Sequence, residues 1–202
     1  MTTAKDLFTI ALEPHPEHSV GQGDLSLSLA GAELLDLLRA QAIDLDGDLI
    51  VPGSQPILDD RLLGAAASAL VRQMPYEHVE DWLWRRGRDL AAAYQAAFEE
   101  DGLLARARRG RLNFGADRME LVDTPARRLA QSRWEEDEPV LRALASAIGI
   151  RRSEVPENDA GPDDEAVTTV LAAVNDAVTE LEAVRQRRSI ENAAFANVWR
   201  FP

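Results

Sequence analysis

A leucine-rich run in the first fifth of the chain constrains the fold more than any other feature. From Leu25 to Arg39 the sequence reads LSLSLAGAELLDLLR, which changes from alternating to helical spacing of apolar residues. Its second half carries leucines at four positions, Leu34, Leu35, Leu37 and Leu38. Such spacing builds a broad apolar helix face that must be covered by other elements. The run therefore predicts a core helix.

Prolines, glycines and apolar spacing predict further helices. Pro75 breaks one pattern, and Gly102 is placed to end another as a C-cap. Val79 and Trp82 share a helix face that we expect to point into the core. Helices are expected from Asp59 to about Met74, from near Glu77, and over Gly87–Gly102, Pro125–Trp134, Pro139–Ile150 and Val167–Val184.

Two short segments have the alternation and turn residues of β-hairpins. Ile43–Val51 reads IDLDGDLIV around an Asp-Gly pair, and Leu103–Val122 has strand-like pieces around Arg109-Gly110. With 202 residues and 46% apolar content the chain can fill a real core. The sequence thus predicts a mainly α-helical, single globular domain with one or two small β-hairpins.

The expected domain spans residues 1–184, and a basic and aromatic tail follows at residues 185–202. The segment 153–165 combines two prolines, a glycine and six acids, which is typical of a flexible loop. No run is long and apolar enough to span a membrane, and the N-terminus lacks the pattern of a signal peptide. The chain has no cysteine, so thiol chemistry is excluded. We expect a cytoplasmic protein.

Arginine is distributed unevenly along this acidic chain. Residues 85–133 hold 11 of the 21 arginines and 7 acidic residues, a local charge of +4 in a chain of net charge −13. Large amphipathic side chains such as Trp84 and Phe114 lie among these arginines. The pattern favours one face that binds an anionic partner, and a phosphate-rich membrane surface suits it.

The sequence gives little support for catalysis. His15 and His18 lie with Glu13 and Glu17 in a proline-broken loop, which is a poor frame for a metal site. Neither a nucleophile elbow nor a phosphate-binding glycine loop is present. We expect no catalytic residues, no metal site and no cofactor.

The block from Pro56 to Leu104 resembles the Golgi phosphoprotein 3 family, which is defined by the GPP34 domain, and its bacterial branch in particular. The resemblance rests on an ordered set of features: the helix start at Leu58-Asp59, the helix to Met74, the proline break, the helix with Val79 and Trp82, and the E-x-G-L-L ending at Glu100–Leu104. Upstream, Leu29–Leu45 looks like the helix and first strand of the family. The resemblance extends over roughly Leu7 to Val184.

This resemblance implies a non-catalytic, peripheral membrane protein that binds phosphatidylinositol 4-phosphate. Arg88 matches one headgroup-binding arginine of the family, and Arg85 lies one turn earlier. Two other headgroup donors fall on Ala91 and Ala30, and the tryptophan of the family's early loop has no counterpart. The predicted headgroup site is Arg85, Arg86 and Arg88, and the membrane-facing hairpin is Arg106, Arg108, Arg109, Arg111 and Phe114, with Met119 as a second inserting group.

Other interpretations remain open at this point. The helix arginines could simply pair with Asp81, Asp89 and Glu99. The helix Gly87–Asp101 followed by a basic hairpin also fits a winged-helix nucleic-acid binder, although its many alanines argue against it. The aromatic tail could bind a protein partner, as in a scaffold, or pack on the domain as an ordered helix.

Overall fold

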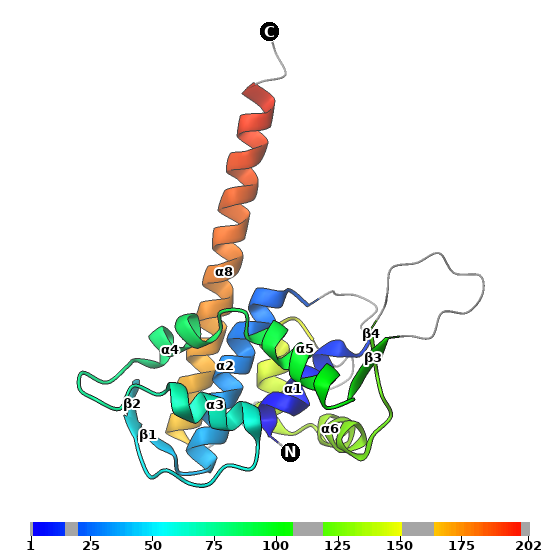
Figure 1. Cartoon of the computed structure of the whole chain (residues 1–202). Coiled ribbons are helices and arrows are strands. Elements are labelled where there is room, and N and C mark those ends of the chain that lie inside the picture. Colours follow the sequence, from blue (N-terminus) through cyan, green and yellow to red (C-terminus); the bar gives the residue numbers. More distant parts are fainter. Residues whose placement is uncertain (1, 15–19, 107–118, 151–163, 199–202) are drawn as a thin grey trace, which may run out of the picture.

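A computed structural model of the chain describes residues 2–14, 20–106, 119–150 and 164–198. These residues form eight helices and two antiparallel sheets of two strands each (Figure 1). The helices are α1 (Thr3–Leu12), α2 (Gln22–Arg39), α3 (Arg61–Ala69), α4 (Val79–Arg86), α5 (Leu90–Glu100), α6 (Pro125–Glu135), α7 (Pro139–Ala147) and α8 (Glu165–Val198). The prediction of a mainly helical single domain with two small hairpins is confirmed.

Helix α2 is the centre of the fold. Every side chain from Leu25 to Leu37 is buried, and α1, α4, α5, α7 and α8 all pack around this helix. The first half of the leucine run, in which apolar residues alternate with small ones, belongs to the same helix. Alternating spacing is compatible with a helix here because other elements cover this helix on all sides, so that it needs no polar face. At Gly31 an added Cβ would lie 2.3 Å from the Val174 side chain, so this glycine permits the close approach of α2 and α8.

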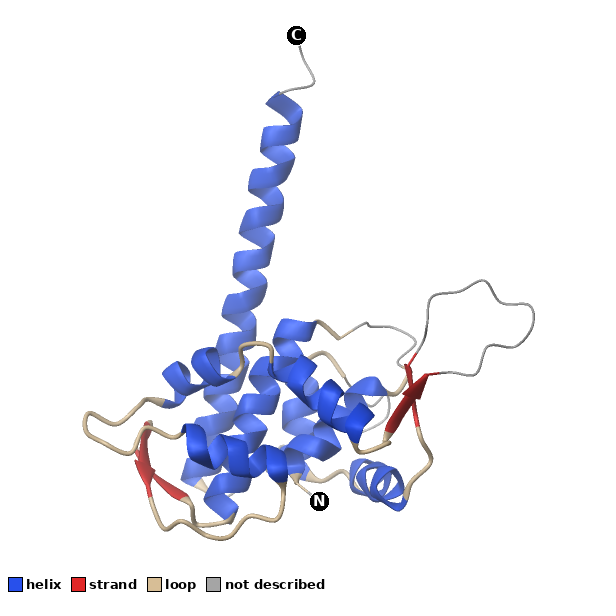
Figure 2. Cartoon of the chain, in the orientation of Figure 1, coloured by secondary structure: helices blue, strands red, loops and turns tan. Residues whose placement is uncertain are grey.

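Two hairpins form in the predicted segments, at the two sides of the body (Figure 2), but the predicted turn at Arg109-Gly110 lies outside the described residues. In the first, β1 (Ile43–Asp46) pairs with β2 (Leu49–Pro52), and the turn between them contains Gly47 at a φ of 62°. In the second, β3 (Leu104–Arg106) pairs with β4 (Met119–Leu121). The positive φ at Gly47 is the reason an Asp-Gly pair predicts this kind of turn.

Helix α3 ends at Ala69, so the prediction that it continues to about Met74 is wrong. The side chain of Arg85 donates a hydrogen bond to the Ala69 carbonyl oxygen at 3.1 Å. The last carbonyl groups of a helix lack an N–H partner within the helix, and here the guanidinium of Arg85 supplies a donor to one of them. The next helix, α4, buries Val79 and Trp82 as its spacing predicts.

Helix α8 extends well beyond the predicted end at Val184. It runs alongside α2 and then continues past the body to Val198 (Figure 1). No proline or glycine lies between Val184 and Val198 to stop it. Among the residues that the structure describes, no helix has both the length and the hydropathy needed to cross a bilayer.

Candidate functional site

The arginine triplet predicted as a headgroup site surrounds the connection between α4 and α5, here called the α4–α5 junction (Arg86–Leu90). The backbone N–H of Ala91 donates to the hydroxyl oxygen of Ser26 at 3.0 Å, which ties the junction to the first turns of α2. At Gly87 an added Cβ would lie 2.5 Å from the Leu83 carbonyl oxygen. A side chain at this position would clash with the backbone of α4 itself, so glycine is required where α4 ends.

The positions that correspond to two family donors belong to the core in this chain. Ala30 and Ala91 are both buried. The indole N–H of Trp82 donates to the Ala30 carbonyl oxygen at 3.1 Å, so this tryptophan also has a structural role. The expectation that Trp82 is a core residue is confirmed. Neither alanine can supply a hydrogen-bond donor from its side chain.

Arg86 is held by a buried acid. Its guanidinium donates two hydrogen bonds to Glu33, from Nε to Oε2 at 2.7 Å and from Nη2 to Oε1 at 2.9 Å. The hydroxyl of Tyr94 donates to the same carboxylate at 3.2 Å. Burial raises the pKa of Glu33, and the hydrogen bonds from Arg86 oppose that shift. A bidentate pair of this kind fixes both side chains.

Arg85 is engaged by a different acid. Its Nε and Nη2 atoms donate to the two carboxylate oxygens of Glu77 at 2.6 and 2.7 Å, and these hydrogen bonds raise the pKa of Arg85. Its guanidinium also lies 5.2 Å from the ring centroid of Trp82, within the range of a cation–π contact. In the alternative interpretation, in which the arginines pair with acids, Arg85 and Arg86 do so, but their partners are Glu77 and Glu33 rather than Asp81, Asp89 and Glu99.

Arg88 differs from its two neighbours. Its side chain is exposed, and it has no hydrogen bond or ion pair with any residue that the structure describes. It precedes Asp89, whose φ of 55° marks the sharp turn before α5. Within the predicted triplet, Arg88 is thus the one guanidinium that remains open to an external anion.

A second group of arginines lies close by on α8. Nη1 of Arg185 is 2.8 and 2.7 Å from the two carboxylate oxygens of Asp24 in the first turn of α2. Arg187 and Arg188 follow it, and both are exposed and unpaired among the described residues. The open arginines of α8 and of the α4–α5 junction are therefore at the same end of α2.

Only part of the predicted membrane-facing hairpin lies within the described residues. Arg106 is the last residue of β3 and pairs in register with Met119. Arg108, Arg109, Arg111 and Phe114 lie outside the described residues, as do His15, Glu17 and His18. Met119 is half-buried and packs against the core, so it does not stand free as an inserting group.

The exposed face of α5 carries no basic residue. It consists of alanines and acids, namely Ala92, Ala93, Ala96, Glu99 and Glu100. A recognition helix needs basic or polar groups that reach phosphates and bases. In the described ranges no cluster of His, Cys, Asp and Glu could hold a metal ion, and Glu13 is bonded to Arg127 at 2.8 Å.

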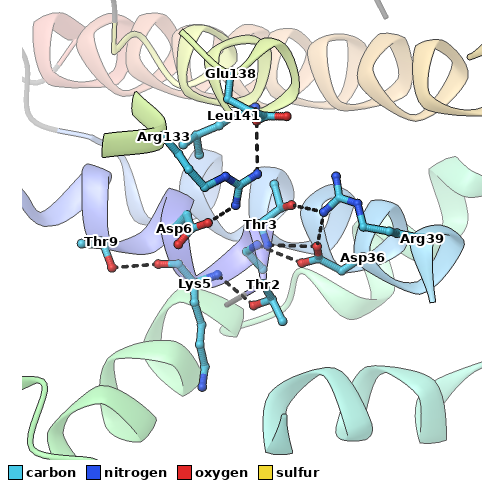
Figure 3. Close-up of polar contacts among 11 residues, drawn as sticks. Thr2, Thr3, Lys5, Asp6, Thr9, Asp36, Arg39, Arg133, Glu138 and Leu141 are labelled. Carbon is cyan, nitrogen blue, oxygen red and sulfur yellow. Dashed lines mark hydrogen bonds and ion pairs between the residues drawn. The ribbon is translucent and has the colours of Figure 1, made fainter. Parts of the chain in front are cut away.

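Three buried acids were not anticipated from the sequence. Besides Glu33 they are Asp6 and Asp36 (Figure 3). Asp36 accepts hydrogen bonds from the backbone N–H groups of Thr3 and Ala4, and Asp6 accepts one from Arg133. Burial raises the pKa of Asp36, and it raises that of Asp6 to about 6. The signal in the sequence is that Glu33 and Asp36 interrupt a leucine run on one helix.

Comparison with known protein families identifies a match over most of the chain. A family model described as Golgi phosphoprotein 3 (GPP34) matches residues 4–189. No curated protein matches the chain. The matched range includes α1 through most of α8, and with them the α4–α5 junction and all three buried acids.

Proposed function

Because the chain belongs to the Golgi phosphoprotein 3 (GPP34) family, we propose that it is a non-catalytic, peripheral membrane protein that binds anionic lipid headgroups. Members of this family bind phosphatidylinositol 4-phosphate. The proposed contact is the end of the molecule where the α4–α5 junction meets the first turns of α2. Arg88 is the central residue of this contact.

The observation that supports this proposal is the difference in pairing among the three arginines, of which two are bonded to acids and one is not. Arg85 and Arg86 each form two hydrogen bonds with a carboxylate, whereas Arg88 is exposed and unpaired in the described structure. An arginine without an acid partner can bind a phosphate without first breaking an ion pair. Each basic residue near an anionic bilayer contributes about 1 kcal/mol to binding. Arg85 and Arg86 then act mainly by holding the junction in place.

The headgroup preference is proposed to be weak. A selective phosphoinositide site needs several convergent donors, each charge-assisted hydrogen bond adding about 1.5–3 kcal/mol. Two family donor positions are the buried Ala30 and Ala91 here. We therefore expect the charge density of the bilayer to matter more than the identity of the phosphate carrier. The hairpin arginines Arg106, Arg108, Arg109 and Arg111 would add to this electrostatic contact.

Co-sedimentation with vesicles tests the proposal. Three vesicle compositions are compared: neutral lipid, generic anionic lipid, and phosphatidylinositol 4-phosphate at matched charge, each with and without competing duplex DNA. Binding to both anionic compositions, absence from neutral vesicles and resistance to DNA is the expected result. Failure to bind either anionic composition, or complete displacement by DNA, would contradict the proposal. Strong preference for the phosphoinositide would show that donors other than residues 30 and 91 complete a selective site.

A further inference from the structure

The last part of α8 projects from the body as a free helical arm, here called the α8 extension (Gln186–Val198). Arg185 is its last fixed point, since its guanidinium is bonded to Asp24 at the start of α2. The helix continues for 13 residues to Val198. At a rise of 1.5 Å per residue the α8 extension is about 20 Å long. Figure 1 shows it rising beyond the other helices.

Its described side chains are open to solvent. All residues from Gln186 to Asn192 are exposed, and Ile190 is 69% exposed. Arg187 and Arg188 have no acid partner in the described residues. An isolated helix of this length is marginal in water, and most helical stability in proteins comes from a covered face. The α8 extension therefore has the properties of a segment that gains its stability from an external surface.

Charge indicates what kind of surface this is. Residues 186–202 contain three arginines and one acid, so they carry +2 in a chain whose net charge is −13. The same segment holds Ile190 together with aromatic residues at positions 195, 199 and 201. Basic groups combined with Ile, Phe and Trp are typical of helices that lie in the interface of an anionic bilayer. A second copy of this acidic chain, or another acidic protein, could form ion pairs with the arginines. It would not offer the apolar layer in which Ile190 and the aromatic residues are buried at a bilayer.

The position of the α8 extension also favours the anionic membrane surface that we propose for Arg88. The α4–α5 junction is tied to α2 at Ser26, and Arg185 is tied to α2 at Asp24, so both lie at the same end of that helix. The α8 extension stands about 20 Å beyond this end. A flat bilayer that approaches this end of α2 along the axis of α8 meets the α8 extension before it reaches Arg88.

We propose that the α8 extension is a second membrane contact, which lies along the anionic lipid surface that Arg88 binds. This inference rests on the proposed function of the α4–α5 junction. Tilting the α8 extension onto the surface breaks no ion pair in the described structure, because the ion pair that joins α8 to the start of α2 is made by Arg185 with Asp24, before the extension begins. In this arrangement Arg187 and Arg188 lie at the level of the lipid phosphates, and Ile190 lies at the edge of the acyl chains.

A single environment-sensitive label tests this placement. The chain has no cysteine, so Ile190→Cys gives one site for a nitrobenzoxadiazole probe. Ile57→Cys is a matched control, since Ile57 is 96% exposed and lies in the β2–α3 loop at the other end of the molecule (Figure 1). With anionic vesicles, the probe at position 190 is expected to shift to shorter wavelength and brighten severalfold, whereas the probe at position 57 stays unchanged.

Charge removal gives an independent measure. Arg187→Gln with Arg188→Gln should lower the vesicle partition coefficient about thirtyfold, at roughly 1 kcal/mol for each arginine. The control pair, Arg72→Gln with Arg128→Gln, removes the same charge from exposed sites elsewhere on the body and should leave binding unchanged.

The outcomes separate this inference from the proposed function. Vesicle binding with no change of the probe at position 190 would overturn the role of the α8 extension and leave Arg88 in place. A probe change that depends on protein concentration in the absence of lipid would mean a second copy is the partner, which also overturns it. Absence of binding to every vesicle composition would remove the proposed function as well.

Discussion

The guanidinium of Arg86 and the carboxylate of Glu33 form a bidentate pair in which the acid is completely buried. Both bonds are short, at 2.7 and 2.9 Å, and the exposed fractions of the two side chains are 18% and 0%. Pairing makes a buried carboxylate tolerable, but it also withdraws the arginine from external ligands. This relationship divides the arginines of the α4–α5 junction into structural ones and the open Arg88.

Removing Arg86 should destabilise the fold. Arg86→Met leaves Glu33 as an unpaired charge in the core, which costs about 3–5 kcal/mol. Urea denaturation at neutral pH measures the free energy of unfolding. The double variant Glu33→Gln with Arg86→Met should recover part of the loss, because no buried charge remains. Two variants of equal stability would contradict a structural role for the pair.

Asp36 should anchor the start of α1. Its carboxylate accepts from the backbone N–H groups of Thr3 at 2.9 Å and Ala4 at 3.1 Å. Asp36→Ala leaves two buried donors without partners, so we expect a loss of about 2–3 kcal/mol in the free energy of unfolding. Hydrogen exchange of the α1 amides should accelerate in this variant. The exposed Glu80→Gln should change neither quantity.

The stability of the protein should depend on the protonation of Asp6. Burial raises the pKa of this carboxyl from 3.8 to about 6, and its Oδ1 atom is buried without a hydrogen-bond partner in the described structure. The folded state therefore binds the proton more tightly than the unfolded state. The resulting stabilisation is fully present below pH 3.8 and is lost as the pH rises through about 6.

Replacing this group isolates its effect. For wild type and Asp6→Asn, the free energy of unfolding is compared at pH 4.5 and pH 7.5, and the wild type should gain on the order of 2 kcal/mol more on acidification. An amide at position 6 can still accept from Arg133 but does not titrate. Identical pH dependence in the two proteins would show that Asp6 does not take up a proton in this range.

Truncation should separate binding from folding. A chain that ends at Ser189 lacks most of the α8 extension, whose described side chains are exposed. Its thermal midpoint should match that of the full chain, because the side chains described after Ser189 are exposed and make no core contact. Its partition onto anionic vesicles should fall. A large drop in the midpoint would instead indicate that the segment after Ser189 packs on the body.

The sequence predicts those parts of the fold that depend on local patterns. The first hairpin, the burial of Trp82 and the left-handed Gly102 after α5 each follow from spacing or turn chemistry. The end of α3 was harder to predict from local patterns, since the carbonyl of its last residue, Ala69, is bonded to Arg85, 16 residues further along the chain. The continuation of α8 to Val198 differs from the predicted end at Val184, because the change in composition there brings no proline or glycine that would end a helix.

The candidate site was less predictable than the fold. The arginines of the triplet are equivalent in sequence, yet their partners come from elements far away, such as Glu33 on α2 for Arg86. From the sequence alone, the acids nearest along the chain are the natural candidates for partners of these arginines. Only the packing of α4 against α2 shows which guanidinium is open. The matching of family positions to Ala30 and Ala91 was informative, because both are buried in the structure.

The most direct test of the central claim compares two arginines that differ in whether an acid holds them. Arg88 is exposed and unpaired in the described structure, whereas Arg128 is exposed and lies 3.0 Å from a carboxylate oxygen of Asp123. Partitioning onto anionic vesicles is measured for Arg88→Gln and Arg128→Gln. We predict a loss of about fivefold for Arg88→Gln and no change for Arg128→Gln. Equal partition coefficients for the two variants would contradict the account.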